Sequence, residues 1–123
     1  MSIDVRAKGK RFEREIAKRV GGRRTPCSGG LDIKGDVRDM WGAYKTWIIE
    51  CKHQEKGGLW AFVRQAKAEI GASLNDWIVV WKRNNEQPIA IIDFEVWCNM
   101  VEELHELREK VQELVEENAG EAL

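Results

Sequence analysis

Three features of the sequence predict a mixed α/β fold in which helices flank a central mixed sheet. Apolar residues recur at helical spacing in three segments, residues 5–20, 59–74 and 94–118. Short runs rich in β-branched and aromatic residues mark strands at 46–52, 77–81 and 89–92. These segments alternate along the chain as helix, strands, helix, strands and helix, an order typical of one sheet covered by helices.

The length and composition favour one globular domain. The chain has 123 residues, of which 43% are hydrophobic and 33% are charged, so it can form one modest core. We expect the domain to span residues 1–118, followed by a disordered tail at 119–123. No apolar run is long enough to span a bilayer, and the first residues lack the apolar stretch of a signal peptide. Three scattered cysteines argue against a disulfide framework, so we expect a cytoplasmic protein without membrane contact.

Charge is distributed unevenly along the chain. Residues 1–34 contain ten basic and four acidic side chains, a net charge of +6, whereas residues 94–123 contain two basic and nine acidic ones, a net charge of −7. A strongly basic front predicts a polyanionic partner. A solvated surface remains the alternative interpretation of the same composition.

The first predicted helix carries an acid in an unusual place. We expect this helix over residues 5–20, with Gly21–Gly22 ending it. At about 100° per residue, one face of the helix gathers its apolar side chains, namely Phe12, Ile16, Ala17 and Val20. Glu13 falls inside this apolar sector, whereas Glu15 points the opposite way. A carboxylate on the inward edge of a helix is costly unless it is paired, so Glu13 becomes a candidate functional residue.

The strand at 46–52 brings two charges together. Strict alternation places Glu50 and Lys52 on one face of this strand and Cys51 on the other. Asp36 stands at the start of the preceding strand, directly after a loop at 23–35 that is rich in glycine, serine and proline. We therefore expect Asp36 to reach the same part of the sheet as Glu50.

Three carboxylates meeting beside one ammonium group predict a metal site. Glu13, Asp36 and Glu50 would repel one another strongly without a cation. Hard divalent ions prefer oxygen ligands of this kind, and Mg²⁺ retains waters for a substrate phosphate and a nucleophile. Lys52 could then orient the attacking water or stabilise a developing oxyanion.

The second half of the chain supplies the rest of the fold. Gly57–Gly58 precedes the helix at 59–74, and Asn84–Asn85 predicts a reversal between two strands that are covered on both faces. Asp93 is a favourable N-cap for the last helix. That helix carries a heptad seam, formed by Trp97, Met100, Leu104, Leu107, Val111 and Leu114. The seam is suited either to packing back on the sheet or to self-association.

At Gly35–Asp36 and Glu50–Lys52 the chain resembles the PD-(D/E)xK nuclease superfamily. With Phe12–Glu13 on a basic opening helix and the loop TPCSGG at 25–30, it is similar in particular to Holliday-junction resolvases of archaeal and phage type. The resemblance covers roughly the first sixty residues. It implies a restriction-endonuclease-like core and an Mg²⁺-dependent endodeoxyribonuclease, with Mn²⁺ able to substitute. It also implies a homodimer that cuts four-way junctions or other branched DNA during recombination or repair.

The resemblance also implies roles for individual residues. Asp36 and Glu50 correspond to metal ligands, and Lys52 corresponds to the catalytic lysine. Glu13 matches the glutamate of the first helix that completes or supports the metal site. Ser28 matches a loop serine near the scissile phosphate, and an ordinary loop hydroxyl is its alternative interpretation.

One departure from the family pattern concerns the aspartate. Asp32 competes with Asp36 for the ligand position, and we favour Asp36 because it follows Gly35 and precedes the strand-like Val37. The proline that often precedes this aspartate is missing. Gln65 on the second helix corresponds to a glutamine that supports the metal site in some of these nucleases.

The basic front supplies the expected DNA contacts, which are Lys8, Lys10, Arg11, Arg14, Arg23 and Arg24. Alternative functions are a nicking, flap or restriction-like endonuclease of the same fold, and a DNA-binding relative without catalysis. A coiled-coil interaction module, in which the basic half docks an acidic partner, is a further alternative.

Overall fold

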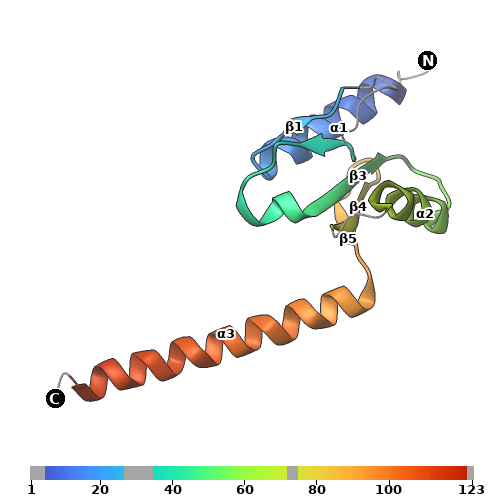
Figure 1. Ribbon diagram of the computed structural model, residues 1–123. Coiled ribbons are helices and arrows are strands. Elements are labelled where there is room, and N and C mark those ends of the chain that lie inside the picture. The colour runs from blue at the N-terminus through green and yellow to red at the C-terminus, as the bar shows by residue number, and fades with distance from the viewer. Residues whose placement is uncertain (1–4, 27–34, 72–74, 122–123) are drawn as a thin grey trace. The chain divides into compact units, whose positions relative to one another are not determined.

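A computed structural model describes residues 5–26, 35–71 and 75–121 (Figure 1). The chain forms two compact units, Met1–Ile92 and Asp93–Leu123. The first unit contains, in order, α1 (Val5–Arg19), β1 (Arg23–Arg24), β2 (Val37–Arg38), the 3₁₀ helix η1 (Gly42–Thr46), β3 (Trp47–His53), α2 (Leu59–Ile70), β4 (Asp76–Lys82) and β5 (Ile89–Ile91). The second unit consists of α3 (Phe94–Glu121).

The first unit is built on a mixed sheet of three strands in the order β3-β4-β5. β3 and β4 run parallel, with Glu50 beside Val79 and Lys52 beside Trp81. β4 and β5 run antiparallel, as the predicted hairpin requires. A parallel pair needs a crossover connection, and α2 lies in the segment that joins β3 to β4 (Figure 1). The predicted mixed α/β class is therefore confirmed.

A second, two-stranded sheet of β1 and β2 adjoins β3. β1 pairs antiparallel with β2, and the backbone N–H of Thr25 donates to the carbonyl of Asp36 at 2.9 Å. The N–H of Asp36 in turn donates to the carbonyl of Ile49 at 2.7 Å. These bonds fix Asp36 beside the edge of the three-stranded sheet.

The two helices of the first unit contribute to different hydrophobic clusters on β3 and β4. One cluster joins Phe12, Ala17 and Val20 to Ile49 and Cys51. The other joins α2 to β4 through Phe62, Val63, Ala66, Trp77 and Val79. The alternation predicted for β3 is confirmed, because its apolar side chains Ile49 and Cys51 face α1 while Glu50 contacts α2 through Gln65.

Most predicted element bounds agree with the structure to within a few residues. α1 ends at Arg19, one residue before the expected end, where Gly21 adopts a φ of +71°. Its predicted apolar face is confirmed, since Phe12 and Ala17 are buried and Ile16 packs against the same cluster. α2 ends at Ile70, where Gly71 has a φ of +54°; residues 72–74, which were expected to continue this helix, lie outside the described part.

Two local predictions are wrong, and one element was not predicted. Arg23–Arg24 were expected in a loop but form β1, because β2 offers them a hydrogen-bonding partner. Residues 42–46 form an unpredicted 3₁₀ helix. The strand at 89–92 was expected to be covered on both faces, yet Ile89 is 55% exposed. β5 is an edge strand that pairs with β4 alone, so fewer neighbours cover it.

The second unit begins with the predicted cap. Oδ1 of Asp93 accepts from the backbone N–H groups of Glu95 at 2.9 Å and Val96 at 3.3 Å, which satisfies donors that the first helical turn leaves unpaired. α3 continues to Glu121, past residue 118 where a tail was expected to begin. No α3 residue is buried.

Within the described ranges, no helix combines the length and apolar character needed to cross a membrane.

Replacement of Phe12 by alanine is expected to destabilise the first unit by about 3–5 kcal/mol. The side chain is 1% exposed and joins α1 to β3, so its removal leaves a cavity in the cluster beside the carboxylates. Trp60 on α2 is 69% exposed, and Trp60→Ala is the matched control with an expected change within about 0.5 kcal/mol. Chemical denaturation of both variants measures the difference; equal losses would contradict the packing described here.

Candidate active site

Asp36 is held at the edge of β3 by both its backbone and its side chain. Besides the two backbone bonds, its Oδ2 accepts from the backbone N–H of Cys51 at 2.7 Å. Gly35 makes this approach possible, because it has a φ of +79° and a Cβ there would lie 3.1 Å from the backbone N and O of Ile49. A side chain at position 35 would therefore push the Asp36 segment away from β3.

Glu50 is the one charged side chain that is buried among the described residues, with 2% exposure. Its carboxyl group lies beside the carboxyl group of Asp36. Its Oε2 also accepts from Nε2 of Gln65 at 3.3 Å. Two carboxyl groups can share a hydrogen bond only when a proton lies between them. Burial, followed by the charge and hydrogen bond of Asp36, raises the pKa of Glu50 to about 8.

The pKa of Asp36 is also raised, primarily because the group is buried. The backbone donor of Cys51 and the positive charge of Lys52 act in the opposite direction and favour its ionised form. The pair therefore keeps one proton on Glu50 near neutral pH, with Asp36 as the acceptor. A positive charge at this point is what the two groups require.

The Asp36 and Glu50 pair fits a hard divalent cation. Carboxylate oxygens are the ligands that Mg²⁺ prefers, and this ion commonly uses one or two carboxylates together with water and substrate phosphate. Within residues 5–26, 35–71 and 75–121, no group of three or more His, Cys, Asp or Glu side chains is arranged around one possible ion position. The donor set that this part of the chain offers is thus a pair of carboxylates.

Glu13 lies near Asp36 but is engaged elsewhere. Its Oε2 accepts from Nε of Arg24 at 2.5 Å, and the two side chains are 19% and 20% exposed. Burial, together with the negative charge of Asp36, raises the pKa of Glu13, whereas Arg24 lowers it. The expectation that Glu13 has a partner is met by this ion pair. Its role as a third ligand stays a prediction.

Lys52 and Glu50 are linked through one side chain of α2. Nζ of Lys52 donates to Oε1 of Gln65 at 2.8 Å, and Nε2 of the same amide donates to Glu50. The ammonium group also lies 5.4 Å from the ring centroid of Phe62, a favourable cation–π position. The predicted juxtaposition of Glu50 and Lys52 on one strand face is confirmed, and Gln65 holds the two in a fixed relation.

Glu69 is a neighbour of the site that the sequence analysis missed. Its Oε2 accepts from the backbone N–H of Gly35 at 3.5 Å, and its negative charge raises the pKa values of Asp36 and Glu50. Gln65 and Glu69 are four residues apart on α2, so they share a helix face. That spacing relates Glu69 to Gln65 but does not by itself place either residue beside Asp36.

The residues expected to contact DNA divide into two groups: basic side chains of α1, and arginines of β1 that form ion pairs. The side chains of Lys10, Arg11 and Arg14 are exposed on α1, and Lys8 is half-buried. Arg24 is held by Glu13, as described, and is less available to a phosphate.

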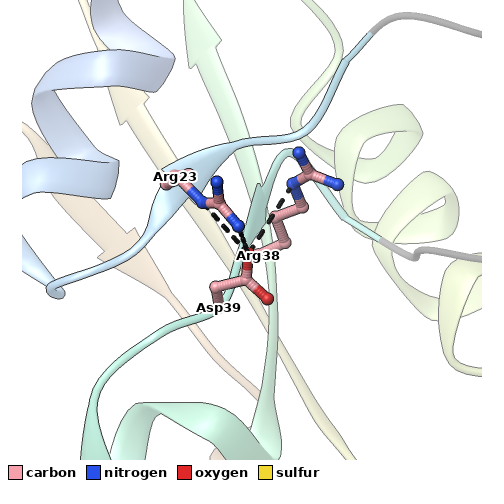
Figure 2. Close-up of polar contacts among 3 residues, drawn as sticks. All are labelled: Arg23, Arg38 and Asp39. Carbon is pink, nitrogen blue, oxygen red and sulfur yellow. Dashed lines mark hydrogen bonds and ion pairs between the residues drawn. The ribbon is translucent and has the colours of Figure 1, made fainter.

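Arg23 belongs to a surface ion-pair cluster with Asp39 (Figure 2). Its Nε and Nη2 donate to Oδ2 of Asp39 at 3.1 and 2.5 Å, and Nε of Arg38 lies 3.9 Å from the same oxygen. The Arg23 side chain remains 71% exposed, so one face of its guanidinium is open to solvent. Ser28, Asp32 and the loop at 27–34 lie outside the described residues.

No protein-family model matches the chain, and neither the curated proteins nor the solved structures gave a match.

The raised pKa of Glu50 predicts a stability that falls with pH in metal-free protein. An unfolded glutamate loses its proton near 4.5, whereas the folded one keeps it to about 8. Between these values only the folded state binds the proton, so the free energy of unfolding decreases as pH rises, by up to about 1.4 kcal/mol per pH unit. The raised pKa of Asp36 acts in the same direction.

Glu50→Gln removes this titration, so the variant is expected to lose less stability than the wild type across the same pH range. Urea denaturation in a chelating buffer between about pH 5 and pH 8 measures both profiles. Parallel profiles for the two proteins would show that Glu50 ionises normally. Addition of Mg²⁺ at the alkaline end is expected to raise the stability of the wild type more than that of the variant.

Proposed function

We propose that this protein is a metal-dependent, structure-selective DNA endonuclease of the Holliday-junction resolvase type. The observation that carries the proposal is the buried carboxyl group of Glu50 beside Asp36, with Gln65 linking Glu50 to Lys52. Buried acids with raised pKa values next to a basic group are typical of functional sites. Their positions agree with the PD-(D/E)xK pattern at Asp36 and Glu50-Cys51-Lys52.

Asp36 and Glu50 would hold Mg²⁺, or Mn²⁺ in its place. When bound, such a cation supplies positive charge to a phosphodiester and makes water a stronger acid. The chain's own residues position the rest. Gln65 fixes the ammonium group of Lys52, from which Lys52 can donate to the nucleophile or to a phosphate oxygen as negative charge develops. The backbone N–H of Cys51 holds the Asp36 carboxylate against β3, the strand that carries Glu50.

The basic side chains of α1 would bind the DNA backbone. Lys10, Arg11 and Arg14 are exposed. The pKa of His53 at the end of β3 is lowered first by burial and then by positive charges that include Lys8 and Arg11. A positive field therefore extends from α1 toward the strand that carries Glu50. Such a field favours phosphate contacts without sequence preference.

The proposal includes a restriction-endonuclease-like core and a branched DNA substrate. Support for the core comes from a site carried by β3 in a mixed sheet that α2 connects. The substrate rests on the resemblance to resolvases. Symmetric cleavage of a four-way junction needs two sites related by a two-fold axis, so the proposed active form is a homodimer in the cytoplasm.

A DNA-binding protein without cleavage is the second candidate. One observation favours it: Glu13 is paired with Arg24 rather than added to a ligand set. This candidate predicts binding without strand scission in any divalent metal. The two proposals are therefore separated by one cleavage assay.

Asp36→Asn and Glu50→Gln are each expected to reduce cleavage by roughly 100-fold or more, because a bound cation contributes several kcal/mol to the transition state. Binding of the same DNA should change little, since these carboxylates do not contact phosphate without metal. Glu15→Gln, on the exposed side of α1, is the matched control and should cleave at the parental rate. Labelled four-way junction, linear duplex and single strand are incubated with Mg²⁺, Mn²⁺ or chelator.

Selective cutting of the junction supports a resolvase, whereas equal cutting of all three substrates indicates a general endonuclease of the same fold. Binding of the wild type without cleavage supports the inactive candidate. Parental activity in either carboxamide variant would overturn the site assignment.

Reversal of two exposed charges on α1, Arg11→Glu with Arg14→Glu, is expected to weaken DNA binding and to flatten its salt dependence. Loss of two phosphate contacts should reduce the slope of log K against log [salt] by about 2. The double reversal Lys45→Glu with Lys56→Glu, at two exposed positions outside α1, is the control for the same change of net charge alone. Fluorescence anisotropy over a range of NaCl concentrations measures the slopes; equal slopes for the wild type and the double variant would exclude α1 from the interface.

A further inference from the structure

α3 carries a long apolar seam that its own unit does not bury. The helix has 28 residues and no buried side chain. Its seam residues Trp97, Met100, Leu104, Leu107, Val111 and Leu114 are between 46% and 59% exposed. Most of the stability of a protein helix comes from packing of its apolar face. This seam therefore requires a partner surface.

The spacing of the seam defines a heptad register in which the core positions are a and d. Position a is occupied by Trp97, Leu104, Val111 and Asn118, and position d by Met100, Leu107, Leu114 and, at the end of the helix, Glu121. Val111 is the one β-branched residue at a, and a β-branched residue at a together with leucine at d, here Leu107 and Leu114, favours two strands. Six of the nine acids of α3 fall at the outer positions c and f, which are Glu95, Glu102, Glu106, Glu109, Glu113 and Glu116. The strong negative charge is thus directed mainly away from the seam.

We infer that α3 pairs with α3 of a second copy of this chain in a parallel, in-register, two-stranded coiled coil. The inference concerns assembly and does not rest on the proposed chemistry. In a parallel pair, each residue at g lies beside the residue at e of the following heptad on the partner helix. This geometry aligns Glu103 with Arg108 of the second copy, and the symmetric contact occurs twice.

The remaining flanking contacts are also compatible with self-pairing. Val96 meets Val101 across the interface, and Lys110 meets Val115, so no pair of like charges is brought together at e and g. The exposed valines at e, 46% for Val101 and 56% for Val115, widen the apolar surface next to the seam. The same helix therefore supplies both halves of a complementary interface.

Asn118 selects the direction and register of the pair. A side-chain amide carries both a donor and an acceptor, so Asn118 can bond to its own copy across a two-fold axis when both helices start together. A single asparagine at a is known to specify register and strand number at some cost in stability. An antiparallel pair centred on Leu104 and Leu107 would instead place Asn118 opposite Asp93, beyond the seam.

Polar side chains on the outer face of α3 interact with one another within the helix. His105 and Glu109 approach to 3.1 Å, and Nε2 of Gln112 donates to Glu116 at 3.1 Å. Neither contact uses a seam residue. Pairing of two copies therefore leaves these interactions intact, and both first units join the coiled coil at the same end, where Asp93 begins α3.

The mass of the full chain in solution tests the pairing. Analytical ultracentrifugation over a range of micromolar concentrations is expected to show a dimer. Leu107→Asp places a charge at the centre of the seam and should convert the dimer to monomer. Gln112→Asp adds the same charge on the outer face and should leave the dimer in place. A monomeric wild type, a trimer, or a dimer that survives Leu107→Asp would overturn the inference.

Disulfide trapping tests the direction of the helices. In a background with Cys27→Ser and Cys98→Ser, Leu114→Cys is expected to cross-link two copies under mild oxidation, because parallel pairing places the two d residues face to face. Glu113→Cys, at an outer position, is the matched control and should cross-link poorly. Antiparallel pairing would separate the two Leu114 positions by about 25 Å. Absence of the Leu114→Cys cross-link in a dimeric protein would therefore overturn the parallel arrangement.

Discussion

The first unit depends on one electrostatic constraint, the placement of two carboxyl groups against each other at the edge of β3. Glu50 is almost fully buried and lies beside Asp36, so the pair requires a positive charge, either a proton or a cation. The surrounding groups reduce the free-energy cost of burying two carboxyl groups but do not remove it. Gln65 donates to Glu50, the backbone of Cys51 donates to Asp36, and Lys52 supplies a nearby positive charge. If these positions had only a structural role, apolar side chains would make the core more stable.

The architecture explains why these groups meet. β3 lies between two hydrophobic clusters, one with α1 and one with α2, so its alternate residues face different helices. Glu50 and Lys52 face α2, whose Gln65 orders both. Glu13 extends from α1 and reaches only the neighbourhood of Asp36. Asp36, at the edge of the sheet, is the residue that interacts with both sides.

The basic side chains of the first unit serve two different purposes. Arg24 neutralises Glu13 in a half-buried pair, and Arg23 binds Asp39, so part of the positive charge stabilises the fold. Lys10, Arg11 and Arg14 remain exposed and are available to a polyanion. The negative charge of the chain is concentrated in α3, where most acids lie away from the apolar seam. Each unit thus exposes its own type of surface, one basic and one apolar with an acidic back.

The sequence by itself determined the mixed α/β class, the helices and strands, the shared strand face of Glu50 and Lys52, the cap at Asp93 and the seam of α3, because periodicity and capping are local properties. Tertiary structure alone decided three other matters. Arg23–Arg24 form a strand because β2 lies beside them. Glu13 pairs with Arg24 rather than joining a shared ligand set. Glu69 lies near Asp36, where it accepts from the backbone N–H of Gly35. These outcomes depend on which distant side chains meet across the fold, and spacing along one element carries no information about that.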